Sequence, residues 1–125
     1  MPVSYVIDVK NKVVIVTVTG TLTVHDVLEF RKQIASDPAF DSSFSQLGDM
    51  SGAKADLSAH EVKMLAESSP FALGARRAFV GTSPVVYGLG RMFEIMRGLR
   101  GDQDIRVFRD RDEAMAWLLE KNQAT

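Results

Sequence analysis

Several polar residues near the middle of the sequence have the side-chain types that bind anions. Thr82 and Ser83 follow the apolar residues Ala78–Val80 and precede Pro84, a residue that favours the first position of a helix. We therefore predict a strand, a short loop and a helix with Ser83 as its N-cap. The free backbone N–H groups at such a helix start bind carboxylates and phosphates, and they lie at the carboxyl end of the strand.

Other polar residues are expected at the same edge of the sheet. Tyr87 and Arg91 lie one and two turns into the predicted helix, whereas Asp49 and Ser51 come at the end of an earlier strand. Helix capping and ordinary surface exposure explain the same residue types, so both interpretations stay open. The predicted ligand or anion site at the strand ends consists of Asp49, Ser51, Thr82, Ser83, Tyr87 and Arg91.

The sequence contains no pattern typical of catalysis or of metal binding. It has no cysteine and no G-x-S-x-G motif, and each of its two histidines, His25 and His60, falls in the first turn of a different predicted helix. Asp102 and Asp104 fall in a predicted turn, where reversal of the chain explains them. We therefore expect no metal, no cofactor and no enzymatic activity.

Composition limits the classes of partner. The 125 residues carry a net charge of −1, whereas nucleic-acid binding needs a clustered basic surface, so we expect no nucleic-acid partner. No apolar run has the length that a transmembrane segment needs, and the absence of cysteine is compatible with a reducing compartment. We expect a cytoplasmic protein in which residues 1–125 form a single domain.

Strands and helices alternate along most of the sequence. Strands are predicted at Ser4–Val9, Lys12–Thr19, Ser45–Asp49, Ala78–Val80 and Ile105–Phe108. Helices are predicted to follow the N-cap residues Thr23, Ser58, Ser83 and Asp110. The order is ββαβαβαβα, which predicts an α/β fold with an N-terminal antiparallel hairpin, parallel pairing of the last four strands and four helices.

The helix that follows Ser83 is apolar around more of its surface than a single buried face requires. Val85, Leu89 and Leu99 belong to the predicted inward stripe, and Val86 and Ile95 widen it. Gly88 and Gly90 each weaken a helix by about 1 kcal/mol, so we expect close packing at these glycines. The predicted interface, with a second copy or another protein, consists of Val86, Gly90, Phe93, Ile95 and Arg97.

This element order, together with Asp49-Met-Ser-Gly52 and Asp56-Leu-Ser58, resembles the STAS domains, the fold of the anti-sigma-factor antagonists (SpoIIAA-like). The segments Arg76–Val80 and Tyr87–Phe93 look closer to a divergent branch of stand-alone bacterial SpoIIAA-like proteins of uncharacterised function. The shape of that branch is also similar to CRAL-TRIO lipid-binding domains. In regulatory STAS domains a serine at the start of the second helix is phosphorylated, and the resemblance places this serine at Ser58.

Three functions follow from the resemblance and the helix pattern. The first is a non-enzymatic interaction or regulatory module that binds a protein partner or self-associates as a homodimer. The alternative is a CRAL-TRIO-like carrier of a lipid or other small apolar ligand, and the third is an anti-sigma-factor antagonist switched by phosphorylation of Ser58, which also fits an N-cap. The carrier predicts a cavity lined by Phe71, Leu73, Phe79, Met92 and Phe93.

Overall fold

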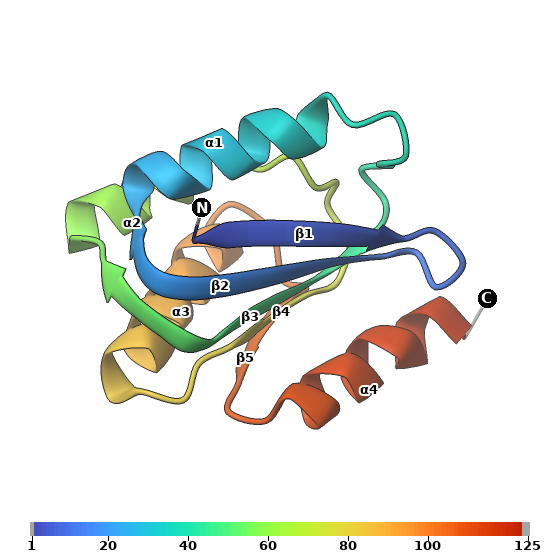
Figure 1. The fold of residues 1–125 in the computed structure, drawn as a ribbon. Coiled ribbons are helices and arrows are strands. Elements are labelled where there is room, and N and C mark those ends of the chain that lie inside the picture. The colour runs from blue at the N-terminus through green and yellow to red at the C-terminus, as the bar shows by residue number, and fades with distance from the viewer. Residues whose placement is uncertain (1, 124–125) are drawn as a thin grey trace.

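A five-stranded mixed sheet forms the middle of the molecule, as Figure 1 shows. The structure is a computed structural model that describes residues 2–123, with side chains as far as position 120. The strands lie in chain order from β1 at one edge to β5 at the other. β1 pairs antiparallel with β2, and all other neighbours pair parallel. The strands are β1 Val3–Asp8, β2 Val13–Thr23, β3 Ser45–Asp56, β4 Arg77–Val80 and β5 Ile105–Phe108.

Four helices complete the predicted order ββαβαβαβα, which the structure confirms together with the mixed sheet. Thr23, Ser58 and Ser83 are N-caps as predicted, because each side chain accepts a hydrogen bond from the N–H three residues later. Among the described residues, none of the helices combines the length and apolar character that crossing a bilayer requires. The helices are α1 Val24–Ala35, α2 Ala59–Leu65, α3 Pro84–Gly98 and α4 Arg111–Gln123.

Two neighbouring strands are longer than the sequence pattern predicts. The sequence predicts that β2 ends at Thr19 and β3 at Asp49. In the structure the two strands remain paired in parallel as far as Thr23 and Asp56, after a register shift. Gly20 has φ 69°, a left-handed conformation that is cheap for glycine and lets β2 continue. The added part of β3 consists mainly of residues that are poor strand formers, so pairing with β2 defines it rather than local propensity.

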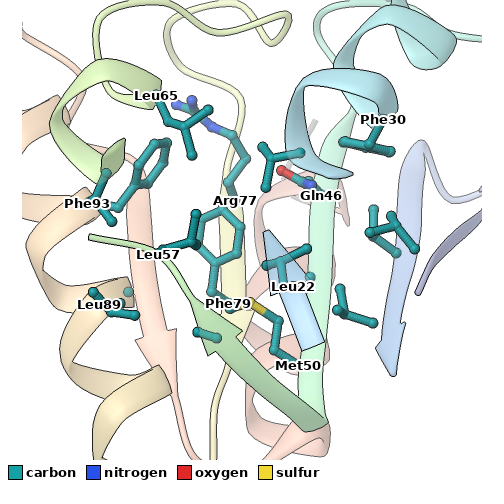
Figure 2. A pocket seen from close by; sticks show the side chains of 18 of the residues that line it. Leu22, Phe30, Gln46, Met50, Leu57, Leu65, Arg77, Phe79, Leu89 and Phe93 are labelled. Carbon is teal, nitrogen blue, oxygen red and sulfur yellow. The ribbon is translucent and has the colours of Figure 1, made fainter. Parts of the chain in front are cut away.

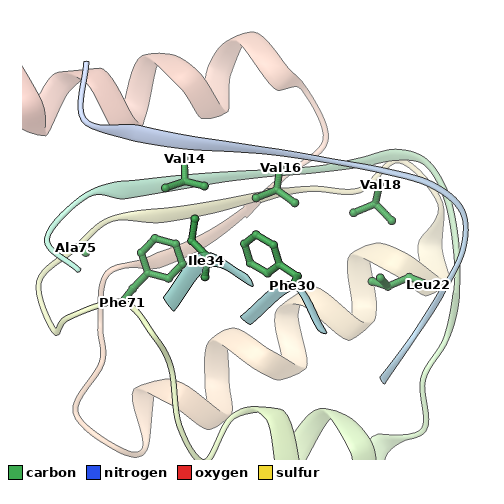
Figure 3. Close-up of a cluster of buried hydrophobic side chains, with 8 residues drawn as sticks. All are labelled: Val14, Val16, Val18, Leu22, Phe30, Ile34, Phe71 and Ala75. Carbon is green, nitrogen blue, oxygen red and sulfur yellow. The ribbon is translucent and has the colours of Figure 1, made fainter. Parts of the chain in front are cut away.

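The two faces of the sheet carry separate hydrophobic cores, because successive strand residues point to opposite faces. Helix α1 covers one face and α4 covers the other (Figure 1), and Figure 3 shows the core side chains beneath α1. The core beneath α1 contains Val14, Val16, Val18, Leu22, Phe30, Ile34, Phe71 and Ala75. The core beneath α4 contains Val13, Leu47, Ala78, Val80, Ala114 and Leu118.

Helix α3 is turned differently from the predicted inward stripe. Val85 and Leu99 were expected inside but are 63 % and 84 % exposed, whereas Val86 is buried. The reason is a close approach to β5, since a Cβ on Gly90 would lie only 3.2 Å from both methyl groups of Val107. Close packing therefore explains Gly90 as predicted, but Gly88 faces open space and has no such explanation.

Candidate ligand-binding pocket

A pocket of about 140 Å³, partly open to solvent, lies between the sheet and helices α1, α2 and α3 (Figure 2). Strands β2 and β3 contribute Leu22 and Met50 to its walls, and the helices contribute Phe30 and Leu89. Most of the lining is hydrocarbon or aromatic. Such a surface favours the apolar body of a small molecule and leaves orientation to a few polar groups.

The cavity predicted for a ligand carrier agrees in part with this pocket. Phe71, Phe79 and Phe93 line it, and the rings of Phe79 and Phe93 meet edge to face with centroids 5.7 Å apart. Leu73 is 66 % exposed, and Met92 is not part of the lining, so these two residues are corrections to the prediction. The sequence identified Phe71, Phe79 and Phe93 as cavity residues because they lie in or next to segments predicted to be buried.

Polar side chains interrupt the lining at Arg31, Gln46, Ser69 and Arg77. Gln46 and Arg77 extend from neighbouring strands, as Figure 2 shows, and both are more than nine-tenths buried. No aspartate or glutamate is part of the lining within the described residues. The polar lining is therefore rich in hydrogen-bond donors and carries positive charge.

Arg77 belongs to a buried ion cluster with Asp102 and Arg97. The Nη2 group of Arg77 donates to one carboxylate oxygen of Asp102, and Arg97 donates to the other from Nη2 at 2.9 Å and from Nε at 3.1 Å. Two further donors reach backbone carbonyls, from Arg77 Nε to Ala75 and from Arg97 Nη1 to Ala66, and Arg77 Nη1 donates to the hydroxyl of Ser69 at 3.4 Å. Two guanidinium groups thus share a single carboxylate.

Asp102 has a structural role that the predicted chain reversal does not explain. The residue is 2 % exposed, and it connects strand β4 with the end of helix α3 through its two arginines. Burial alone would raise the pKa of its carboxyl, but the hydrogen bonds and charges of Arg77 and Arg97 outweigh burial and lower that pKa. The sequence offered one signal, since Arg77 stands directly beside the buried run Ala78–Val80.

Arg31 adds further positive charge on the α1 side of the pocket. Burial of its guanidinium, and then the nearby charge of Arg97, lower the pKa of Arg31 to about 10. The group therefore remains protonated at neutral pH. In the part of the chain that the structure describes, Arg31 forms no ion pair with a carboxylate.

The strand-end residues are brought together only in part. The N–H and hydroxyl of Ser51 donate to Asp49 Oδ1 at 3.1 and 2.6 Å, and the hydroxyl of Thr82 donates to the backbone oxygen of Ser51 at 3.2 Å. Arg111 Nε lies 3.2 Å from Asp49 Oδ2, a contact that the sequence did not suggest. The carboxylate of Asp49 gives this cluster a negative group, which disfavours an anion.

The other three residues of the predicted anion site, Ser83, Tyr87 and Arg91, each contact a different partner. Ser83 caps α3, Arg91 pairs with Glu94 at 2.8 Å, and the ring of Tyr87 lies 4.2 Å from the guanidinium of Arg109. These contacts agree with the capping and surface interpretation. The anion site at the strand ends stays a prediction that no contact in the structure supports.

Ser58 lies exposed at the junction of β3 and α2. Its hydroxyl accepts the N–H of Glu61 at 3.1 Å, and its own N–H donates to Glu61 Oε1 at 2.9 Å. This capping box accounts for the serine structurally. Phosphorylation of Ser58 stays a prediction.

The predicted interface on α3 needs correction at three positions. Val86, Gly90 and Arg97 are buried within the chain itself, by the sheet or by the ion cluster, and cannot form an outer surface. Phe93 lines the pocket, whereas Ile95 is 55 % exposed. Only Ile95 of the five therefore lies where another protein could contact it directly.

Metal-binding residues do not come together in the described part of the chain. Residues 2–123 contain no group of three or more His, Asp or Glu side chains that could hold a metal ion. His25 and His60 are both exposed on different helices.

Comparison with known proteins identifies the fold. No family model matches the sequence, and no curated protein sequence matches it. A solved structure does match, described as an uncharacterised protein of the DUF3478 family with a SpoIIAA-like fold from Shewanella loihica PV-4. The similarity covers 84 % of this chain and 82 % of that protein, with 20 % identity and a TM-score of 0.55. The chain therefore has the SpoIIAA-like fold that the sequence predicted, a divergent form of the STAS domain fold.

Proposed function

We propose that this protein is a non-catalytic binding module that holds a small apolar or amphiphilic molecule between the sheet and helices α1, α2 and α3. The observation that carries the proposal is the partly open pocket of about 140 Å³ with its largely hydrocarbon lining. Protein interiors are normally close-packed, and an unfilled apolar space lacks dispersion contacts. A ligand body in this pocket would supply those contacts and remove its own apolar surface from water.

The volume suits a small ligand. An engineered apolar cavity of about 150 Å³ binds benzene, which sets the scale for one ring or a short alkyl chain. Edge-to-face pairing of Phe79 and Phe93 adds an aromatic wall against which such a body can pack.

Filling the pocket with a larger side chain should weaken ligand binding. We expect Leu89→Trp, on the α3 wall, to weaken binding of the probe 1-octanol by at least about tenfold, because the indole would occupy space that the alkyl chain needs. Isothermal titration calorimetry measures the affinity. Leu99→Trp is the matched control, since Leu99 is 84 % exposed at the end of the same helix and should leave the affinity unchanged. Equal affinities of the two variants would contradict the proposal.

A second candidate function is self-association through the outer side of α3. Val85, Gly88, Ile95 and Leu99 are exposed and recur at helical spacing, so they share one side of the helix. Open space beside Gly88 would let a second helix approach closely. This exposed stripe of four residues supports the interaction-module interpretation. The buried positions of the predicted interface do not support it.

A charge in the stripe should disrupt such a dimer. We expect Ile95→Glu to weaken self-association at least about tenfold, because an unpaired carboxylate in an apolar contact is costly to desolvate. Sedimentation velocity over a range of protein concentrations gives the equilibrium constant. Val9→Glu is the control, since Val9 is similarly exposed, at 57 %, in the hairpin turn. A wild-type protein that sediments as a monomer at every concentration would exclude this second function.

A further inference from the structure

Gln46 is a largely buried polar side chain of the pocket and lies on β3 beside Arg77 of β4. It is 7 % exposed, and its amide extends from β3 into the pocket, as Figure 2 shows. Within the described residues its amide group takes part in no hydrogen bond. The amide atoms keep contact with the open space of the pocket, so they are available to donate to or accept from a polar group of a ligand there.

The charge around the same pocket is strongly one-sided. Arg31 and Arg77 belong to the lining, and Arg97 lies directly behind it in the ion cluster. Among the described residues, Asp102 is the acid that pairs with Arg77 and Arg97, and these two arginines already share its carboxylate. Three guanidinium groups against one carboxylate leave an excess of positive charge in a partly desolvated site.

Arg31 is the group in this set whose charge is not matched by the protein. Its guanidinium is desolvated enough to lower its pKa to about 10, and within residues 2–123 it has no carboxylate partner. Desolvation without an ion-pair partner is unfavourable. An anion that entered the pocket would restore the missing interaction.

Given the proposed function, we infer that the pocket selects organic monoanions, with an apolar body among the aromatic and aliphatic side chains and a carboxylate bound by Arg31 and Gln46. A carboxylate is planar and has two acceptor oxygens, which suit the N–H groups of a guanidinium and the N–H₂ group of an amide. The absence of acidic residues from the described lining removes repulsion of such a head group.

A pair of probes with the same alkyl chain separates the head group from the body. Isothermal titration calorimetry of the wild-type protein should show that octanoate binds at least about tenfold more tightly than 1-octanol, because charge-assisted hydrogen bonds form only with the acid. Arg31→Gln should weaken octanoate by at least about tenfold and leave 1-octanol unchanged. Gln46→Leu should weaken octanoate several-fold and likewise retain 1-octanol.

Lys32→Gln is the matched control for charge. It removes one positive charge from the next residue of α1, which is exposed, so both probes should bind as they do to the wild type. Retained 1-octanol binding also shows that the pocket of each variant is folded. Equal binding of the two probes to the wild type, or equal effects of Arg31→Gln and Lys32→Gln, would overturn the inference while the pocket proposal stands. Failure of both probes to bind the wild type would overturn both.

Discussion

Asp102→Asn should lower the free energy of unfolding by about 3–5 kcal/mol, because it removes the charge that compensates two buried arginines. The side chain of Asp102 is fully enclosed, and both guanidinium groups have almost no access to water. An asparagine of the same shape cannot neutralise them and can accept hydrogen bonds through only one oxygen. Urea denaturation followed by circular dichroism measures the change.

Asp104→Asn is the matched control, since Asp104 lies two residues away and forms no ion pair within the described part of the chain. Its substitution should change stability by less than about 0.5 kcal/mol. Equal losses for the two variants would show that the buried cluster is not what holds β4 to the end of α3.

The stability difference between wild type and Asp102→Asn should also depend on pH. The arginines lower the pKa of Asp102 in the folded protein despite its burial, whereas an unfolded aspartate titrates near about 3.9. The carboxylate therefore contributes its full stability above about pH 5, and this contribution is lost as the pH falls through the folded pKa. If the difference in free energy of unfolding between the two proteins stayed the same from neutral pH to well below about pH 5, the ionised Asp102 would not be the source of that stability.

Leu118→Ala should lower the free energy of unfolding by about 2–5 kcal/mol, the usual cost of truncating a buried leucine. Leu118 is 0 % exposed and joins α4 to the sheet through the core that includes Leu47, Ala78 and Val80. The resulting cavity would lie on the face opposite the ligand pocket, so a ligand bound in the pocket would not fill it. Chemical denaturation in the absence of any probe measures the loss.

The control for this second variant is Leu99→Ala, which makes the same chemical change at a side chain that is 84 % exposed. It should alter stability by no more than about 0.5 kcal/mol. Octanol binding to folded Leu118→Ala should match the wild type, because the two faces of the sheet carry separate cores. A small loss at Leu118 would mean that α4 contributes little to the stability of the sheet.

Local chemistry explains why much of the fold was predictable. Thr23, Ser58 and Ser83 cap their helices through bonds to residues only three positions away, so the sequence alone contains both partners. The β-branched run of β2 and the apolar run of β4 likewise carry their own strand signal. The second half of β3 lacks such a signal, and pairing with β2 decided its conformation.

The candidate pocket was predictable only in outline. Phe71, Phe79 and Phe93 were expected around a cavity because apolar residues follow the periodicity of buried elements. Gln46 and Arg31 were not identified, since neither residue type nor spacing distinguishes them from surface positions. Both line the pocket only because α1 packs against the sheet, and that packing involves residues far apart in the chain.

The sequence by itself determined the element order, the helix starts and the mixed parallel sheet, because these depend on contacts between near neighbours and on alternation along each strand. The tertiary structure alone decided which charges are buried. Arg77 and Asp102 are 25 residues apart, and their pairing arises only when β4 and the end of α3 meet. The same rotation of α3 that sets Gly90 against Val107 buries Val86 and leaves Ile95 outside. The burial of these charges and the rotation of α3 depend on side-chain volume and desolvation at contacts between distant segments. A local sequence pattern does not contain this information.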